Sequence, residues 1–298
     1  MRKRLTLILL VAAAAIAAAP AQTREGGKKE IPSASLTAAA PAQMHSAGQQ
    51  TITVASWNIG HFALGTASDT RLTHAALDFY LPAYRNLFSR LQADILALVE
   101  YNPLLVNATP AKPAVAARDA ILSSYRDAQE GPKLGYNCNA LFSNGIEAMA
   151  TDTVIFSRAK EKRYYLASTM RIGGEEVKVV AAHLDWSQGA DGAACREAQI
   201  KELVDAFADD PYVILCADWN TDSTAEYDAF ARAGYHMANH GRLGDIPTWP
   251  AGNAPSSCID NIIAKGFTIA DVTVVNSPAL SDHCLIMADL TKRSASPR

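Results

Sequence analysis

Acids, amides and histidines stand at the ends of the apolar runs in this sequence, where a strand would meet a turn. Four runs carry them at their C-terminal ends and two at their N-terminal ends; they are Asn58, Glu100, His183, Asp218, Asn220, Asp260, Asp282 and His283. A carboxylate can bind a cation, and an imidazole beside a carboxylate can transfer a proton near neutral pH. Taken singly, Asn58 is better explained as a turn former and His183 as a hydrogen-bonded histidine, and Glu100 and Asp218 are explained equally well by a solvated acid or a turn. Their joint placement at strand ends favours one shared polar site.

The direction of the strands decides whether these residues can meet. All of them reach one edge only if the strands that begin near Asp260 and His283 run antiparallel to the other four. This excludes a purely parallel doubly wound sheet, in which ligands gather at the carboxyl ends. Mixed sheets packed face to face satisfy the requirement. Asp260 adds a further indication, because an acid inside SSCIDNIIA would be buried without an obvious cationic neighbour.

The apolar pattern predicts the elements that position this site. Seven runs are almost continuously apolar, as expected of strands covered on both faces: TITVASWN, ADILALVE, VKVVAAHL, YVILCADWN, CIDNIIA, ADVTVV and CLIMADL. Tyr84, Leu87, Phe88 and Leu91 keep helical spacing after Pro82, which predicts a helix with that proline in its first turn. A second helix is predicted over REAQIKELVDAF, with apolar positions at Ile200, Leu203, Val204 and Phe207. The chain is therefore α/β.

The N-terminal segment MRKRLTLILLVAAAAIAAAPAQ has the order of a secretory signal peptide, with cations, then a short apolar run, then small residues. We predict a signal peptide over 1–21, a flexible leader over 22–50, one domain over 51–292 and a tail over 293–298. No cysteine follows the apolar run closely enough to suggest a bacterial lipid anchor. We therefore expect a secreted or periplasmic protein.

Charge and cysteine content limit the classes of partner. The formal charge is −3, and loss of Arg2, Lys3 and Arg4 with the signal peptide removes three more positive charges, giving −6. A mildly acidic chain gains little long-range attraction to phosphate polymers. The five cysteines form no C-x-x-C pair, which excludes metal-finger and dithiol sites. Cys138 and Cys195 lie in predicted loop or helix-entry positions and are the pair that could form a disulfide in an oxidising compartment.

Six short motifs occur in an order that resembles the endonuclease/exonuclease/phosphatase superfamily, which includes pancreatic-type deoxyribonuclease, bacterial sphingomyelinase and inositol-polyphosphate phosphatases. The motifs lie between residues 52 and 290 and read SWNIG, ADILALVE, AAHLDW, VILCADWN, TWP…CIDNI and LSDHCL. The resemblance implies a four-layer α/β/β/α sandwich of two mixed β-sheets flanked by helices. No arginine follows DWNTDS or SSCIDNI in the manner of the inositol-polyphosphate group, and HLDW resembles the deoxyribonuclease and sphingomyelinase branch.

The resemblance also implies a role for each polar residue. A divalent ion, Mg²⁺ with Mn²⁺ or Ca²⁺ as alternatives, would be held by Glu100, Asn58 and Asp282. His283, oriented by Asp260, would activate the attacking water. The complete catalytic set that the resemblance implies is His283, Asp260, Asp218, Asn220 and His183.

Substrate selectivity is expected to come from the loops that flank the phosphate. The candidate contacts are His61, Phe62, Asn139 and Trp249. Members of the family often carry a serine before a basic residue between the glutamate and histidine motifs, and both NALFSN and TVIFSR fit that place. The choice is therefore between Ser143 and Ser157. The spacing favours Asn139 with Ser143, because two further strands then fit before HLDW.

The expected activity is that of an exported, metal-dependent phosphoric-ester hydrolase, either a phosphodiesterase or a phosphatase. Its substrate would be a nucleic acid, a lipid headgroup or a sugar phosphate, and it would act as a monomer without a stable protein partner. The segment SRAKEKRYY would give a nucleic acid a basic, aromatic rim, although a solvated strand edge explains it more simply. The alternative is a binding domain that keeps the sandwich fold without turnover.

Overall fold

Two six-stranded sheets make up most of the computed structural model, which describes residues 51–62, 74–101, 118–134, 137–239 and 246–293. The first sheet has the order β11-β12-β1-β2-β4-β3, with strands β1 (Thr51–Asn58), β2 (Ile95–Val99), β3 (Asp127–Glu130), β4 (Ala140–Ser143), β11 (Phe267–Val275) and β12 (Leu285–Lys292). The second sheet has the order β5-β6-β7-β8-β10-β9, with strands β5 (Ala148–Ile155), β6 (Tyr164–Ile172), β7 (Glu175–His183), β8 (Val213–Asp218), β9 (His236–Met237) and β10 (Asp260–Lys265).

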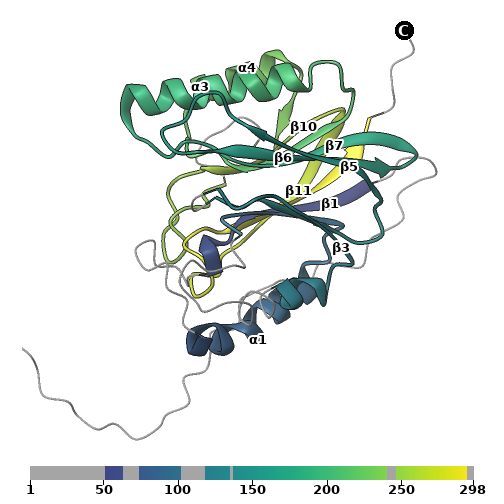
Figure 1. Ribbon diagram of the computed structural model, residues 1–298, viewed down its shortest axis with the longest axis vertical. Helices are drawn as coiled ribbons and strands as arrows, with labels where there is room; N and C mark the ends of the chain where they lie inside the picture. The colour runs from purple at the N-terminus through teal and green to yellow at the C-terminus, as the bar shows by residue number, and fades with distance from the viewer. Residues whose placement is uncertain (1–50, 63–73, 102–117, 135–136, 240–245, 294–298) are drawn as a thin grey trace, which may run out of the picture. The chain divides into compact units, whose positions relative to one another are not determined.

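The sheets pack face to face, and helices cover their outer faces (Figure 1). Helix α1 (His74–Leu91) packs on the first sheet, where Tyr84 and Phe88 join Trp57 of β1 in one apolar cluster. Helices α3 (Gly189–Ala206) and α4 (Thr224–Arg232) cover the second sheet through a separate cluster that includes Leu203 and Phe230. A third cluster fills the space between the sheets. The predicted four-layer α/β/β/α sandwich is therefore confirmed.

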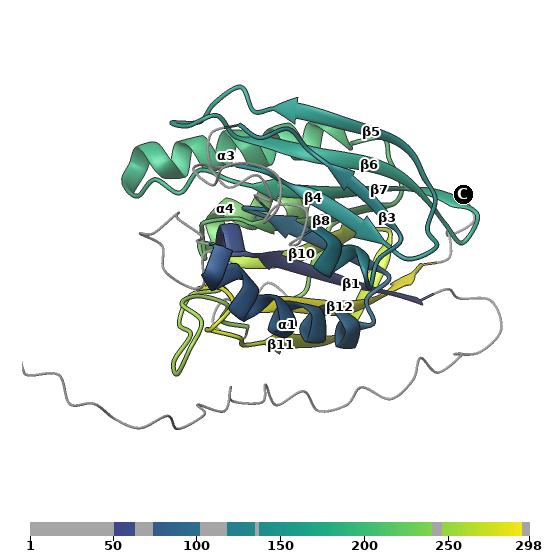
Figure 2. The ribbon, with the colours of Figure 1, turned by 60° about the horizontal axis from the view of Figure 1, so that its bottom comes forward.

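The strands run in the directions that would bring all the polar strand ends to one edge. Strand β1 is parallel to β2 and antiparallel to β12, and strand β7 is parallel to β8, which is antiparallel to β10 (Figure 2). The strands that begin near Asp260 and His283 thus run against the other four. Both sheets are mixed, as predicted.

Alternation along the strands decides which polar side chains enter the space between the sheets. Val54 of β1 belongs to the inter-sheet cluster, and Asn58 lies two strand repeats further along, so it faces the same space. Ala55 and Trp57 belong instead to the cluster beneath α1. The same alternation directs three further strand ends between the sheets: His183 of β7, Asp218 of β8 and Asp260 of β10.

The helix predicted over REAQIKELVDAF is confirmed as α3. The predicted start of the first helix is wrong, because α1 begins at His74 and Pro82 lies inside it. Proline removes one backbone hydrogen bond from a helix interior. The buried face formed by Leu81, Tyr84 and Leu87 packs on the first sheet and holds the helix together across this position. No helix within the described residues is long and apolar enough to span a membrane.

The cysteines do not form the suggested disulfide. Cys138 and Cys195 are both buried and unpaired. Cys138 lies in the cluster beneath α1, whereas Cys195 is on α3, which covers the outer face of the other sheet. The two thiols therefore belong to opposite layers of the sandwich.

Candidate active site

Polar side chains from both sheets meet in the space between them. His183 lies between two carboxylates, with its Nε2 3.4 Å from Oδ2 of Asp218 and its Nδ1 3.8 Å from Oε1 of Glu100. Asn58 donates from Nδ2 to the same Asp218 oxygen at 2.9 Å. The ends of β1, β2, β7 and β8 thus contribute to one site, as their positions in the sequence predicted.

The two residues at the N-terminal ends of strands form a buried pair. Nδ1 of His283 lies 2.9 Å from Oδ2 of Asp260. The loop that carries His283 is fixed to β1, because Ser281 Oγ donates to the Asn58 carbonyl at 2.7 Å and Trp57 Nε1 donates to the His283 carbonyl at 3.0 Å. These hydrogen bonds hold the imidazole of His283 in one orientation toward the site.

The charges of this pair follow from its neighbours. Burial lowers the pKa of His283, but Asp260 and Asp218 outweigh burial and raise that pKa to about 10. Burial and the charge of Asp260 raise the pKa of Asp218 to about 6, against the opposing effect of His283. His283 is thus an imidazolium at neutral pH, and Asp218 is an acid that exchanges a proton close to neutrality. A cation bound nearby would lower the pKa of His283, because like charges repel.

Glu100 reaches the site through an unusual backbone turn. Leu96 and Leu98 of β2 face the α1 layer, so a continued strand would direct residue 100 away from the site. Glu100 instead adopts a φ of 51°, in the left-handed region that residues with a Cβ seldom enter. The turn brings its carboxylate beside His183.

The donor set at Glu100 fits a divalent cation. Burial raises the pKa of Glu100 to about 7, and the charges of Asp218 and Asp282 oppose the lowering effect of His283. An acid that is disfavoured in its ionised form by burial and by other acids is stabilised by a cation. Glu100, Asn58 and Asp282 offer the oxygen ligands that Mg²⁺ prefers, and these are the residues that would hold it.

A second group could also hold a cation. Ligand atoms of Asp218, Asp260 and His283 all lie within 4.8 Å of one another. The imidazolium of His283 opposes a cation at this position, and Asp260 is already hydrogen-bonded to it. The charge distribution therefore favours proton transfer at this group and a cation at Glu100.

Asn220 closes the turn after β8. Its backbone N–H donates to Oδ1 of Asp218 at 2.9 Å, and its Nδ2 donates to the Leu184 carbonyl at 3.1 Å. One amide N–H of Asn220 thus joins the turn after β8 to the loop after β7. This arrangement orients Asp218, and a phosphate beside it could be contacted by the second N–H of the Asn220 side-chain amide.

The loop after His183 is held by a buried arginine that sequence reasoning missed. Arg196 on α3 donates to the carbonyls of Asp185 and Ser187 at 3.2 Å and 2.8 Å, and forms a buried ion pair with Glu226 on α4, where the Nε to Oε2 distance is 2.7 Å. The sequence feature that could have identified Arg196 is a charged residue at the start of the predicted helix REAQIKELVDAF. A charge buried in a core needs such partners.

Arg163 is part of the site and not of a basic rim. It lies within SRAKEKRYY, but its side chain is only 4% exposed and donates from a terminal nitrogen to Oδ1 of Asn137 at 2.7 Å. Burial lowers the pKa of His183 and of His61, and the charge of Arg163 lowers both further. Both interpretations of this segment, a nucleic-acid rim and a solvated edge, are wrong for Arg163.

The candidate substrate contacts divide into buried and exposed residues. Phe62 is 1% exposed and packs against Tyr84 and Tyr101, so it is a core residue and its prediction as a substrate contact is wrong. Asn139 is also buried, and its Nδ2 donates to the carbonyls of Tyr164 and Ala181, which ties the two sheets together.

His61 lies against Glu100 inside the site, whereas two tryptophans are exposed on nearby loops. Nε2 of His61 lies 3.1 Å from Oε2 of Glu100. Trp249 is 40% exposed in the loop before Asp260, where a substrate could contact it. Trp186, 54% exposed in the loop after His183, was not among the predicted contacts. The sequence feature that could have identified Trp186 is its place in the motif HLDW, three residues after His183.

Neither serine of the open register reaches the site. Ser143 pairs with Ile95, the first residue of β2, and therefore lies at the opposite end of that strand from Glu100. Ser157 donates to the Glu202 carboxylate at 2.6 Å. The preferred assignment of Ser143 to the site is wrong, although two strands, β5 and β6, do lie between it and β7 as the spacing predicted.

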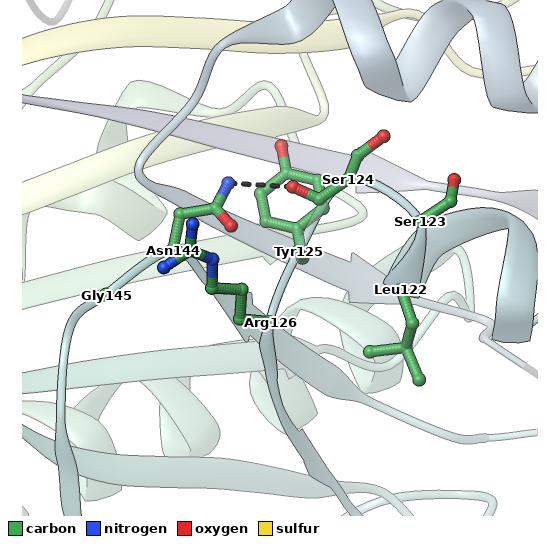
Figure 3. A pocket seen from close by; sticks show the side chains of 7 residues that line it. All are labelled: Leu122, Ser123, Ser124, Tyr125, Arg126, Asn144 and Gly145. Atoms are coloured by element: carbon green, nitrogen blue, oxygen red, sulfur yellow. Dashed lines mark hydrogen bonds between the residues drawn. The ribbon is translucent and has the colours of Figure 1, made fainter.

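A cavity at the far edge of the first sheet is not part of this site. Figure 3 shows its lining, which consists of residues 122–126 with Asn144 and Gly145 and encloses about 520 Å³. Asn144 donates from its backbone to the Asp94 carbonyl, just before β2 begins. The cavity is therefore at the end of β2 opposite Glu100.

Comparison with known proteins identifies the family. The four-layer sandwich carries acids and histidines at one edge, and the family model for the Endonuclease/Exonuclease/phosphatase family matches residues 55–283. The chain belongs to this family. A search of curated protein sequences finds no match.

Solved structures agree on the fold. D. rerio TDP2 humanized by 14 mutations is 15% identical with a TM-score of 0.62, covering 80% of this chain and 98% of that chain. An endonuclease/exonuclease/phosphatase family protein from Bacteroides thetaiotaomicron is 18% identical with a TM-score of 0.61, covering 83% and 100%. D. rerio TDP2 complexed with a single-strand DNA product is 18% identical with a TM-score of 0.59, covering 80% and 98%.

Proposed function

We propose that this protein is an exported phosphoric-ester hydrolase that uses a divalent cation, Mg²⁺ in preference to Mn²⁺ or Ca²⁺. Members of its family are generally metal-dependent hydrolases of phosphoric esters. The observation that carries the proposal is the meeting of Glu100, Asp218 and the Asp260–His283 pair around His183 in one buried space. Such a convergence of acids and imidazoles has no structural purpose that apolar residues would not serve better.

The metal-facing residues in this proposal are Glu100, Asn58 and Asp282. A bound cation would supply positive charge against the phosphoryl oxygens and help to orient the ester. The protein contributes the anionic ligand, Glu100, whose ionised form the burial of the site disfavours. The all-oxygen donor set suits a hard cation, and Mg²⁺ is the one we propose.

Proton transfer is assigned to His283 and Asp218. Their facing atoms, Nε2 and Oδ2, lie 3.8 Å apart, which is too long for a direct hydrogen bond and leaves both available to a water or a phosphate oxygen. Asp260 holds the opposite face of the imidazole through Nδ1. Asp218 can therefore accept a proton from water, and the His283 imidazolium can donate one to the leaving oxygen.

His183 acts on the ester as a neutral donor. Burial, reinforced by the charges of Arg163 and His283, holds its pKa well below the usual value. A neutral imidazole carries one N–H, and Nε2 faces Asp218 at 3.4 Å. A phosphate oxygen entering beside Asp218 would compete for this donor.

The substrate class proposed for the first test is single-stranded DNA. A structural relative, D. rerio TDP2, was crystallised with a single-strand DNA product. In this chain Trp186 and Trp249 expose their indoles on loops that leave the site, and exposed aromatic faces stack on unpaired bases.

Hydrolysis of bis-p-nitrophenyl phosphate, with Mg²⁺ or Mn²⁺ and after EDTA, tests the proposal. The same protein is then assayed on single-stranded DNA, RNA, sphingomyelin, phosphoinositides and sugar phosphates. Glu100→Gln is the inactive reference, and Glu175→Gln, an exposed acid on β7, is its matched control. Binding without turnover on every ester would support the alternative of a non-catalytic binding domain.

Export requires its own experiment. The proposal rests on the signal-like order of residues 1–21. Expression of the full chain in a bacterium, followed by N-terminal sequencing of the periplasmic or secreted protein, should give a mature chain that begins at Gln22. Retention of residues 1–21 in a protein recovered only from the cytoplasm would contradict export.

A further inference from the structure

The chain leaves β1 in a left-handed turn of three residues, Gly60–Phe62. Their φ angles are 56°, 54° and 58°, and only the glycine adopts such values without a steric cost. Left-handed residues with a Cβ persist where the surroundings hold them, and they gather at functional sites. His61 and Phe62 therefore need a structural reason to remain in this conformation.

The turn contacts Asn58 and Glu100 and lies beside Asp282, the three residues assigned to the cation. The Gly60 N–H donates to Oδ1 of Asn58 at 3.0 Å, and this orients the Asn58 amide. The His61 N–H donates to the Glu100 carbonyl at 3.0 Å. A methyl group on Gly60 would lie 3.3 Å from Oδ1 of Asp282, so the glycine allows that carboxylate to approach.

His61 is attached to Glu100 twice. Besides the backbone hydrogen bond, its Nε2 lies 3.1 Å from Oε2 of Glu100, while Oε1 of the same carboxylate faces His183. The His61 side chain is only 12% exposed, so its surroundings hold the imidazole against this carboxylate. The left-handed φ of Glu100 matches that of His61 across this double contact.

Phe62 anchors the turn from the other side. Its ring packs edge-on against Tyr84 of α1, with 5.3 Å between centroids, and against Tyr101, which follows Glu100. Burial of an aromatic ring in this cluster offsets the strain of the turn. The residue's neighbours thus explain why a phenylalanine tolerates a left-handed backbone here.

We propose that His61 is the positioning residue of the cation site, and that the turn Gly60–Phe62 assembles the three residues that would face the ion. By occupying Oε2 of Glu100, His61 directs Oε1 toward the space beside His183. The inference rests on the proposed function only in that a divalent cation binds at Glu100; it does not require a particular ester. Partners that orient a metal ligand change metal affinity by about 10- to 100-fold when removed.

The test measures cation affinity directly, by electron paramagnetic resonance of Mn²⁺ and by calorimetric titration of Mg²⁺ into the full chain. His61→Ala should weaken binding about 10- to 100-fold. His61→Gln, whose Nε2 amide can donate from a similar position, should recover most of that affinity. His236→Ala, an exposed histidine on β9, is the control and should bind as the wild type does.

Activity supplies a second measurement. If His61 positions the ligand and does no chemistry, His61→Ala should raise the Mn²⁺ concentration needed for half-maximal turnover and leave the turnover at saturating Mn²⁺ almost unchanged. Unaltered Mn²⁺ affinity in a folded His61→Ala protein would overturn the inference, as would His61→Gln binding no better than His61→Ala. Failure of the wild-type protein to bind either ion would overturn the proposed function, and this inference with it.

Discussion

The pairing of His283 with Asp260 makes a prediction that does not depend on the identity of the ester. We compare three variants: His283→Ala, Asp260→Asn and the double replacement. The two side chains are joined at 2.9 Å through Nδ1, and this contact leaves Nε2 as the only imidazole nitrogen that can face the substrate. Asp260 therefore acts on the reaction mainly through His283 and should have little effect once His283 is gone.

The expected sizes follow from the roles. Loss of a positioned acid or base costs about 10²- to 10⁴-fold in rate, so we take about 10³ for His283→Ala. An Asp-to-Asn change beside a catalytic histidine can cost about 10⁴, because the amide no longer orients the ring and stabilises the imidazolium as the carboxylate does. Independent residues would multiply to about 10⁷, whereas a unit should lose about 10⁴ in the double variant. The difference corresponds to a coupling of about 4 kcal/mol.

The assay compares kcat/KM on the best ester found, at saturating Mn²⁺, with circular dichroism to confirm folding. Glu100→Gln gives the background rate, and Asp271→Asn combined with His236→Ala provides a matched pair of replacements away from the site. If the loss in the double variant equals the product of the single losses, the reasoning is refuted. An Asp260→Asn protein with nearly wild-type kcat/KM would refute it equally.

Three further outcomes are expected. Glu100→Gln should abolish metal-dependent hydrolysis. The variant should nevertheless melt in EDTA at or above the wild-type temperature, because burial raises the pKa of Glu100 to about 7 and disfavours its charged form. A clearly lower melting temperature would contradict this. Asp260→Asn should destabilise the protein more at pH 6 than at pH 10. The pKa of His283 is raised to about 10 in the folded protein, so its pairing with Asp260 stabilises the fold fully below the pKa of an unfolded histidine, and this stabilisation is lost as the pH rises through about 10. Urea unfolding at both pH values measures the difference. An equal loss of stability at both pH values would argue against the pairing. Arg196→Met should cost about 3–5 kcal/mol in urea unfolding by leaving Glu226 buried without its partner, whereas Lys201→Met, exposed on the same helix, should stay within about 0.5 kcal/mol.

The sequence predicts most of the site because strand alternation is strict. Once TITVASWN and YVILCADWN are recognised as strands buried on both faces, Asn58 and Asp218 must share a face with the residues two and four positions earlier. The same rule holds for His183 at the end of β7. The antiparallel direction of the last strands then follows from requiring all polar ends to meet, and the observed pairings confirm it.

Prediction fails where a long-range contact outweighs a local preference. Pro82 reads as a helix start, but packing of α1 on the first sheet extends the helix on both sides of it. Phe62 reads as a loop residue near the substrate, yet the cluster of Tyr84 and Tyr101 buries it. Arg163 lies in a charged segment that any hydropathy rule places in water, and the acids of the site hold it inside.

At Glu100 the sequence predicts the position of the acid, but a long-range contact decides the direction of its side chain. The motif ADILALVE predicts an acid at the end of β2, but alternation along β2 directs that position toward α1 and not toward the site. Only the left-handed φ of 51° and the two contacts with His61 bring the carboxylate to His183. Nothing in the residues around Glu100 encodes that backbone angle, since no glycine or asparagine precedes or replaces it. The angle is set by a turn 40 positions earlier in the chain, so the residue on which the cation depends most is the one whose geometry its own motif determines least.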